Sequence, residues 1–326
     1  MPISNDVLKD AITSRHTLDQ LGEEFTGLGT HYSGKVRENF SRDGTRLIIV
    51  TDRVSAFDVH LGTIPFKGQI LNRLAQYWFD LTGDRFPNHV LDVPDPQAMR
   101  AVECEPVPVE FVVRGYLTGT SLTSILRAYE KGDRDFCGHV LPDGLRPHQK
   151  LEQNIVTPST KAPKGEHDES VSREQLVARG TIDPELFDRL EARCLALFAH
   201  GQRIAAERGL LLVDTKYELG RRPDGTIVLI DEIHTPDSSR YWYASSYDEA
   251  MRNGEPPKSL DKEFIRRWLV AQGWAGEGTP PPLPDTIRME AARRYVETYE
   301  RLTGEVFVPD REDPRLRLRR NLGLVD

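Results

Sequence analysis

The stretch LLLVDTKYELG, residues 210–220, decides the fold that we expect. It opens with four apolar residues and continues with charged and apolar residues in alternation, the pattern of a β-strand with one buried face. Asp214, Lys216 and Glu218 are two residues apart, so their side chains share one face of that strand. The chain therefore carries an acid–base–acid row on a single strand.

A second strand follows at once, because TIVLIDEI at residues 226–233 comes after an Asp-Gly turn signal. If Leu219 pairs with Thr226, Asp231 lies opposite Asp214 and adds a third carboxylate to the charged face. A slip of one residue turns Asp231 away. Carboxylates placed in this way hold Mg²⁺ against phosphates, and a lysine between them neutralises transferring oxygens. A solvated outer face with cross-strand ion pairs is the alternative interpretation.

Further signals along the chain predict a mixture of helices and strands. Alternating and β-branched segments carry the strand predictions, and helical spacings of apolar residues carry the helix predictions. The expected strands are 32–40, 46–51, 107–113, 210–219 and 226–233, the expected helices are 69–82, 261–272 and 285–302, and a polar loop spans 142–171.

Two helix starts in the second half have specific capping residues. Ser172 and Gln175 form a capping box ahead of a short helix. Asp183 followed by Pro184 is a typical pair of N-cap and first-turn residues, and the helix that it begins should end before Gly209. The buried face of this helix is expected at Leu186, Leu190, Leu197 and Ile204.

The composition limits the classes of function. The 326 residues are 38% hydrophobic and 29% charged, with a net charge of -8, which favours a globular protein and argues against a nucleic-acid surface. Apolar runs are much shorter than the roughly 18 residues that a membrane span requires. Three widely spaced cysteines favour neither a disulfide framework nor a zinc site. No leader pattern begins the chain, so we expect a cytoplasmic protein with no nucleic-acid or membrane partner.

Two polar motifs of the first half lie where a ligand could approach the backbone. SGKVR at residues 33–37 places Lys35 and Arg37 on one side of a strand, but it has neither P-loop nor Rossmann glycine spacing. On its own this segment is better explained as an exposed hairpin. TDRVSAFD at residues 51–58 directly follows a buried strand, a common position for ligand-binding residues. A capped turn explains it equally well.

Further motifs combine hydroxyl, cationic and acidic side chains. TPSTK at residues 157–161 and EHDE at 166–169 lie in the expected loop. His167 could act as a base or a donor, but a surface histidine without a function is at least as common. VRGY at 113–116 and DSSR at 237–240 each come at the end of a strand. Their arginines suit a phosphate or a carboxylate, and a structural salt bridge is the alternative.

Taken in order, these motifs resemble those of the SAICAR synthetase family in its longer, yeast-like form. The resemblance covers residues from about 33 to 304. The matching segments are GKVR at 34–37, TDRVSAFD at 51–58, VRGYLTG at 113–119, TPSTK at 157–161, GEHDE at 165–169, DTKYELG at 214–220 and DEIHTPDSSR at 231–240. Each motif is weak alone, and the ordered set is specific.

The resemblance implies an α+β fold with two lobes and C-terminal helices. A small β-rich lobe over residues 1–113 and a larger α+β lobe over 114–326 would hold ATP in a cleft between them. The implied reaction is an ATP-dependent ligation in de novo purine biosynthesis, in which CAIR and L-aspartate give SAICAR, ADP and phosphate. The resemblance also implies Mg²⁺ as a cofactor. We expect a monomer rather than an oligomer.

The functional residues of the family carry over one at a time to matching positions of this chain. The resemblance places the nucleotide at Ser33, Gly34, Lys35, Arg37, Glu218 and Asp231, and Mg²⁺ at Glu218 and Asp231. It places the other substrates at Ser55, Asp58, Arg114, Thr120, Ser121, Asp168, Asp214, Lys216 and Arg240. The implied catalytic residues are Lys216, Asp214 and Lys161.

Three positions depart from the family pattern. Thr120 is followed by Ser121 where a serine is usual, so either hydroxyl is a candidate contact for the ribose phosphate. Phe66 stands where a small or polar residue is familiar, and His234 replaces an apolar residue. None of these changes removes a charged group that the reaction needs.

Two other functions are open at this point. A small-molecule kinase with the same cleft would release ADP without aspartate. A nucleotide-binding protein that has lost catalysis is argued against by the presence of all the expected acids and lysines. ADP release with CAIR, measured with and without L-aspartate, separates the ligase from the kinase.

Overall fold

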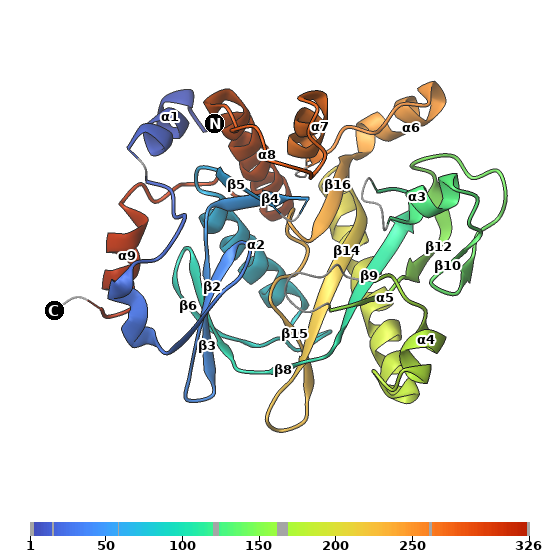
Figure 1. Cartoon of the computed structure of the whole chain (residues 1–326), viewed down its shortest axis with the longest axis horizontal. Coiled ribbons are helices and arrows are strands. Elements are labelled where there is room, and N and C mark those ends of the chain that lie inside the picture. Colours follow the sequence, from blue (N-terminus) through green and yellow to red (C-terminus); the bar gives the residue numbers. More distant parts are fainter. Residues whose placement is uncertain are drawn as a thin grey trace.

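The computed structural model describes residues 3–14, 16–57, 59–119, 124–161, 169–260 and 263–324. Two sheets with antiparallel pairings, one of seven strands and one of five, form its centre, and Figure 1 shows helices packed around them. Two short hairpins lie outside these sheets: β4 (Arg53–Ala56) with β5 (Val59–Thr63), and β10 (Asp135–Phe136) with β11 (His139–Val140).

The seven-stranded sheet is built around β14 (Leu210–Arg221). The partners of β14 are β8 (Glu105–Pro106), β9 (Val109–Tyr116), β15 (Ile227–Ile230) and β16 (Ser239–Tyr243). β12 (Lys150–Val156) and β13 (Ser159–Thr160) pair with β9. Helix α5 (Pro184–Glu207) packs against β14, β9 and β12.

A bulge in β14 explains why its apolar residues point to one face of the sheet and its charged residues to the other. The pairing of β14 with β16 shifts between Leu212 and Asp214. Such an extra residue reverses which residues point to each face. Leu212 before the bulge and Tyr217 after it therefore both enter the main core, while Asp214 and Lys216 line the opposite side, beside a cavity.

The five-stranded sheet has the order β1-β2-β3-β7-β6. These strands are β1 (Thr30–Ser33), β2 (Arg37–Arg42), β3 (Thr45–Val50), β7 (Ala98–Val102) and β6 (Val90–Asp95). Alternate residues of β3 pack on both faces: Leu47 and Ile49 contact a cluster that includes Leu318 of α9 (Pro314–Asn321), and Val50 enters the main core with α2 (Lys67–Thr82). Both faces are therefore covered.

Backbone hydrogen bonds join the two sheets. The His89 amide donates to the Leu229 carbonyl over 3.0 Å, and the Leu229 amide donates to the Pro87 carbonyl over 2.9 Å. β9 runs across residue 113, where the boundary between the two lobes is expected. The division at residues 113 and 114 stays a prediction.

The other helices lie around the two sheets. They are α1 (Asn5–Thr13), the 3-10 helix η1 (Glu23–Leu28), α3 (Ile125–Glu130), α4 (Arg173–Ala178), α6 (Ala244–Asn253), α7 (Glu263–Ala271) and α8 (Asp285–Thr303). Helix α8 packs against α1, α2 and α7, and it runs from the top of the molecule down toward its centre in Figure 1. Among the described residues, no helix has the length and apolarity needed to cross a membrane.

The helix predictions are confirmed where capping chemistry is local. Both hydrogen bonds of the Ser172–Gln175 capping box are present. The Asp183 side chain accepts from the Leu186 amide over 2.9 Å at the start of α5, which ends at Glu207. The helices expected at 69–82 and 285–302 are α2 and α8, and that expected at 261–272 is α7, whose first described residue is Glu263.

Two strand predictions and one loop prediction are wrong. Leu219 pairs with Leu229, not with Thr226, because the connection between β14 and β15 is closed by its own hydrogen bonds, such as Arg222 amide to Thr226 carbonyl. Asp214 consequently does not face Asp231. The strand expected at 32–40 is two antiparallel strands, β1 and β2, with a turn at 34–36. The segment expected to be a loop at 142–171 contains β12 and β13, which both pair with β9.

Candidate active site

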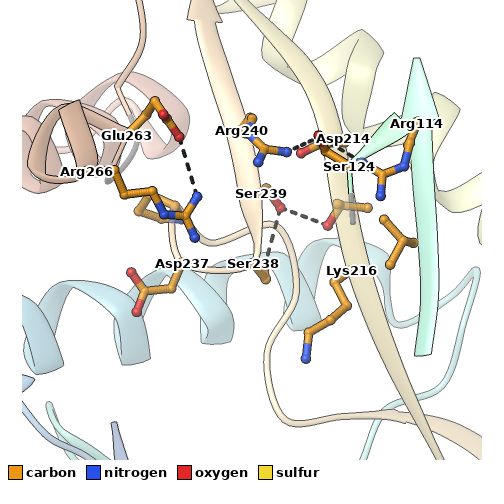
Figure 2. Close-up of a pocket in the computed structure, with 13 residues that line it drawn as sticks. Arg114, Ser124, Asp214, Lys216, Asp237, Ser238, Ser239, Arg240, Glu263 and Arg266 are labelled. Carbon is orange, nitrogen blue, oxygen red and sulfur yellow. Dashed lines mark hydrogen bonds and ion pairs between the residues drawn. The ribbon is translucent and has the colours of Figure 1, made fainter. Parts of the chain in front are cut away.

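A cavity of about 200 Å³ opens beside the charged face of β14. Its charged lining residues are Arg114 on β9, Asp214 and Lys216 on β14, Asp237, Arg240 on β16, and Glu263 and Arg266 on α7. Figure 2 shows these side chains gathered around one space. Three strands and a helix thus bring together charges that lie far apart in the sequence.

The register of the sheet places one carboxylate between two arginines. Asp214 is paired directly with Arg114 on β9 and with Arg240 on β16. Its Oδ2 accepts a hydrogen bond from Arg240 and lies 3.7 Å from Nη1 of Arg114. Arg114 also donates from Nε to the Thr157 hydroxyl over 2.8 Å. Both guanidinium groups are thereby held in one orientation at the cavity.

Lys216 is held between two carboxylates. Its Nζ donates to Glu218 over 2.6 Å and to Glu110 over 2.7 Å, and Lys161 donates to the other oxygen of Glu218 over 2.5 Å. Burial opposes the charge of Lys216, but the neighbouring carboxylates outweigh it and raise the pKa of the ammonium. Burial likewise opposes the charge of Glu218, and the two lysines lower its pKa nevertheless. Lys216 and Glu218 are therefore both ionised at neutral pH.

Arg37 connects the five-stranded sheet to the end of β15. Its guanidinium contacts Asp231 at 3.0 Å and Glu232 at 2.7 Å. Burial raises the pKa of Asp231 to about 6, against the opposing effect of Arg37 and with added repulsion from Glu218 and Glu232. Asp231 also has a φ of 67°, a left-handed conformation that costs free energy in a residue with a side chain. Concentrated negative charge and local strain are both typical of functional sites.

The turn at 34–36 is held by the TDRV segment. The Arg53 side chain donates to the carbonyls of Gly34, Lys35 and Arg37 and to the Glu38 carboxylate. The Thr51 hydroxyl donates to the Val36 carbonyl over 2.8 Å. Of the two interpretations of this motif, the described residues Thr51 and Arg53 agree with a capped turn, because they fix the backbone that carries Lys35 and Arg37.

A model of the SAICAR synthetase family matches residues 30–281 of this chain. The chain belongs to the SAICAR synthetase family. Its activity is that of a SAICAR synthase, a ligase of de novo purine biosynthesis.

Individual relatives and a solved SAICAR synthase agree with this assignment. A protein of Mesorhizobium japonicum is 52% identical over 86% of this chain and 90% of its own length. The phosphoribosylaminoimidazole-succinocarboxamide synthase of Bacteroides fragilis is 50% identical over 88% of this chain and 91% of its own. The structure of the SAICAR synthase of Saccharomyces cerevisiae complexed with SAICAR is 29% identical, with a TM-score of 0.76, over 90% of this chain and 100% of that one. The expected α+β fold is therefore confirmed.

Most of those site residues implied by the SAICAR synthetase resemblance that the structure describes lie in or beside the cavity or in the ion pairs next to it. Arg114, Asp214, Lys216 and Arg240 line the cavity, and ion pairs connect Lys161 to Glu218 and Arg37 to Asp231. Ser33 instead donates to the buried Glu38 over 3.0 Å, and Ser55 lies in β4, outside the cavity lining. The described residues do not include Asp58, Thr120, Ser121 or Asp168.

Four acidic residues and one arginine of the site were not predicted. Asp237, Glu263 and Arg266 line the cavity, Glu110 pairs with Lys216, which lines it, and Glu232 pairs with Arg37. Glu110 had a usable signal, because it precedes Arg114 by four residues in a strand and so shares its face. The other residues reach the site only because of the way the β15–β16 connection and α7 pack, which local sequence patterns do not predict.

Proposed function

We propose that the charged face of β14 activates the carboxylate of CAIR for attack by the amino group of L-aspartate. A carboxylate is a poor electrophile, because its charge is delocalised and its leaving group would be oxide. Phosphorylation by ATP supplies a better leaving group. The observation that carries this proposal is the row of Asp214, Lys216 and Glu218, in which carboxylates and an ammonium alternate beside a cavity.

Arg114 and Arg240 are proposed to hold the anionic groups of CAIR. The planar fork of a guanidinium group matches the oxygens of a phosphate or a carboxylate. Both arginines are fixed by Asp214, and Arg114 also by Thr157. A substrate bound to such prearranged donors loses less freedom in reaching the reacting geometry.

Lys35 and Arg37 are proposed to contact the phosphates of ATP, and Glu218 and Asp231 to hold Mg²⁺. Glu218 is paired with Ile230, so it lies beside the residue that precedes Asp231. The described residues contain no group of three or more acidic, histidine or cysteine side chains arranged to hold a metal. Mg²⁺ needs only one or two carboxylates when phosphate oxygens and water complete its shell, so this pair fits the ion. When bound, Mg²⁺ would neutralise charge on the phosphate oxygens.

The proposed reaction has two steps. A carboxylate oxygen of CAIR displaces ADP from the γ-phosphorus and forms an acyl phosphate. The nitrogen of aspartate then attacks the acyl carbon and loses a proton, and phosphate leaves with the oxygen that came from CAIR. Lys216, with Lys161, neutralises the charge that moves between these groups. Lys161 and Asp168 are proposed to line the side where aspartate approaches.

Oxygen transfer tests this route directly. With CAIR labelled with ¹⁸O in its carboxylate, one labelled oxygen should appear in inorganic phosphate for each turnover, as measured by mass spectrometry. Unlabelled phosphate would contradict the acyl phosphate. Steady-state release of ADP should require CAIR and L-aspartate together. Release at the same rate with CAIR alone would indicate a kinase instead.

Three further expectations are part of this proposal. ATP is held between a lobe of residues 1–113 and a lobe of residues 114–326. The enzyme is a monomer, which light scattering would test against a mass of 37.0 kDa. Its location is cytoplasmic, which fractionation of cells that express it would test.

A further inference from the structure

A buried lysine and a tyrosine hold Asp237 from two helices. Nζ of Lys67, at the start of α2, contacts Oδ2 of Asp237 at 2.7 Å, and the hydroxyl of Tyr295 on α8 donates to Oδ1 over 2.7 Å. The Lys67 side chain is 0% exposed and that of Asp237 is 6% exposed. The ring of Tyr295 lies 5.7 Å from the Lys67 ammonium. Asp237 is thus fixed at both carboxylate oxygens.

Asp237 belongs to the short connection from β15 to β16 that borders the cavity. The amides of Ser238 and Ser239 donate to the Thr235 carbonyl, and the Ser238 carbonyl accepts from the amide of Lys216 over 3.0 Å. Arg240 follows three residues after Asp237. A movement of Asp237 would therefore displace the backbone that leads to Arg240.

We propose that Tyr295 and Lys67 are positioning residues for the CAIR site, acting through Asp237 on Arg240. Taking an ammonium and a carboxylate out of water is costly, and an apolar pair would stabilise the fold as well or better. An ion pair in this position has a clear use when it sets the geometry of a loop. The inference rests on the proposed role of Arg240 in binding CAIR.

The inference also gives α8 a role in the site. The family model ends at residue 281, and α8 begins at Asp285. Tyr295 therefore brings a contact from outside the matched region to a segment that lines the cavity. Helix α8 is itself fixed against α2, which carries Lys67. The two helices and the loop form one connected support.

Tyr295→Phe removes only the hydroxyl and tests the inference. We expect the KM for CAIR to rise about fivefold, less than the roughly tenfold or more for loss of a direct hydrogen bond to a charged group, because the effect passes through Asp237; the KM for ATP should stay within about twofold. Tyr299→Phe on the same helix is the matched control, because the Tyr299 hydroxyl contacts Glu305 at 3.2 Å, away from the cavity. Equal kinetics for the two variants would overturn the inference, whatever their melting temperatures.

Two more variants separate this inference from the proposed function. Lys67→Met should raise the KM for CAIR, and its effect should not add to that of Tyr295→Phe, because both act through Asp237. Full additivity would contradict the shared route. Arg240→Lys reports on the CAIR site itself. If it leaves the KM for CAIR unchanged, the proposed site fails; if it raises the KM while Tyr295→Phe does not, only the positioning role fails.

Discussion

Two clusters of ion pairs, one partly buried and one fully buried, combine cationic side chains and carboxylates in different ways. Beside β14, Lys216 and Lys161 contact Glu218 at the edge of a cavity. Under α9, Arg317 contacts Asp95 at 3.0 Å, and their side chains are 1% and 0% exposed. Gln97 accepts a further hydrogen bond from Arg317 over 2.6 Å. The first cluster has side chains that reach a cavity. The second cluster, Arg317 with Asp95 and Gln97, is closed to solvent and is called the sealed cluster below.

Access to a cavity separates ion pairs that can take part in a reaction from ion pairs that only stabilise the fold. Each group of the sealed cluster keeps its partners only if the fold is intact, so losing one leaves an uncompensated buried charge. In the cluster beside β14, Glu110, Glu218, Asp231 and Glu232 face Lys161, Lys216 and Arg37. This excess of one carboxylate favours the binding of a cation such as a metal ion, which would rearrange the pairs. We therefore expect substitutions in the cluster beside β14 to lower kcat, and substitutions in the sealed cluster to lower the free energy of unfolding.

The largest effect is expected for Lys216→Met. The ammonium contacts two carboxylates and faces the cavity, and its interaction with the reacting groups should strengthen as charge moves. We expect kcat to fall about a thousandfold, with smaller changes in both KM values. Steady-state kinetics with CAIR and ATP varied separately measures this. A rise in KM with an unchanged kcat would instead mean that Lys216 stabilises the bound substrate and the transition state equally.

The next effect is a loss of stability for Arg317→Met. Removing the guanidinium leaves the Asp95 carboxylate buried with fewer donors, which costs about 3–5 kcal/mol in the free energy of unfolding. Urea denaturation measures this cost. The folded fraction should retain its kcat, since α9 contacts the far face of the five-stranded sheet. A variant of normal stability would show that the sealed cluster is not structural.

Arg114→Lys should give a smaller and selective effect. The substitution keeps the charge and loses the planar fork, so we expect the KM for CAIR to rise about tenfold. The KM for ATP should stay within about twofold. Arg134→Lys is a control at an exposed ion pair with Asp143. Equal increases for CAIR and ATP would contradict the assignment of Arg114 to CAIR.

The smallest effect concerns His89, which lies in the backbone connection between the two sheets. Burial, with nearby Arg46, Arg222 and Arg37, lowers the pKa of His89 to about 3. The unfolded chain takes up the proton near pH 6.5, so the stability from the neutral ring is complete above that pH and is lost as the pH falls toward 3. In the His89→Asn variant the unfolding free energy should fall less steeply as the pH decreases, by up to about 1.4 kcal/mol per pH unit. Urea denaturation from pH 7.5 to 4.5 checks this, and an unchanged slope would contradict it.

The comparison also shows which features the sequence could predict. The capping residues of α5 and of the short helix α4 act within four residues, and both predictions are confirmed. The hairpin register failed because the turn at 222–226 is longer than its Asp-Gly signal indicates. Spacing alone placed Lys216 and Glu218 on one face, and they do contact each other.

The long-range part of the site could not be derived from spacing. Asp214 lies opposite Arg114 and Arg240 because three strands separated in sequence align in one sheet. Local patterns do not contain that register, so only the ordered motifs of a family could imply that these residues act together. The Lys67–Asp237–Tyr295 contact joins three distant segments in the same way, and no motif marked Tyr295.

A matched pair of isosteric substitutions separates the role of the ion pairs on β14 from that of the sealed cluster. Glu218→Gln and Asp95→Asn each remove one paired carboxylate and keep the size of the side chain. We predict that Glu218→Gln lowers kcat at least about a thousandfold and changes the unfolding free energy by less than about 1 kcal/mol. Asp95→Asn should lower the unfolding free energy by about 3 kcal/mol and leave kcat within about twofold. The opposite pattern, an active but unstable Glu218→Gln enzyme beside a stable but inactive Asp95→Asn enzyme, would contradict the account.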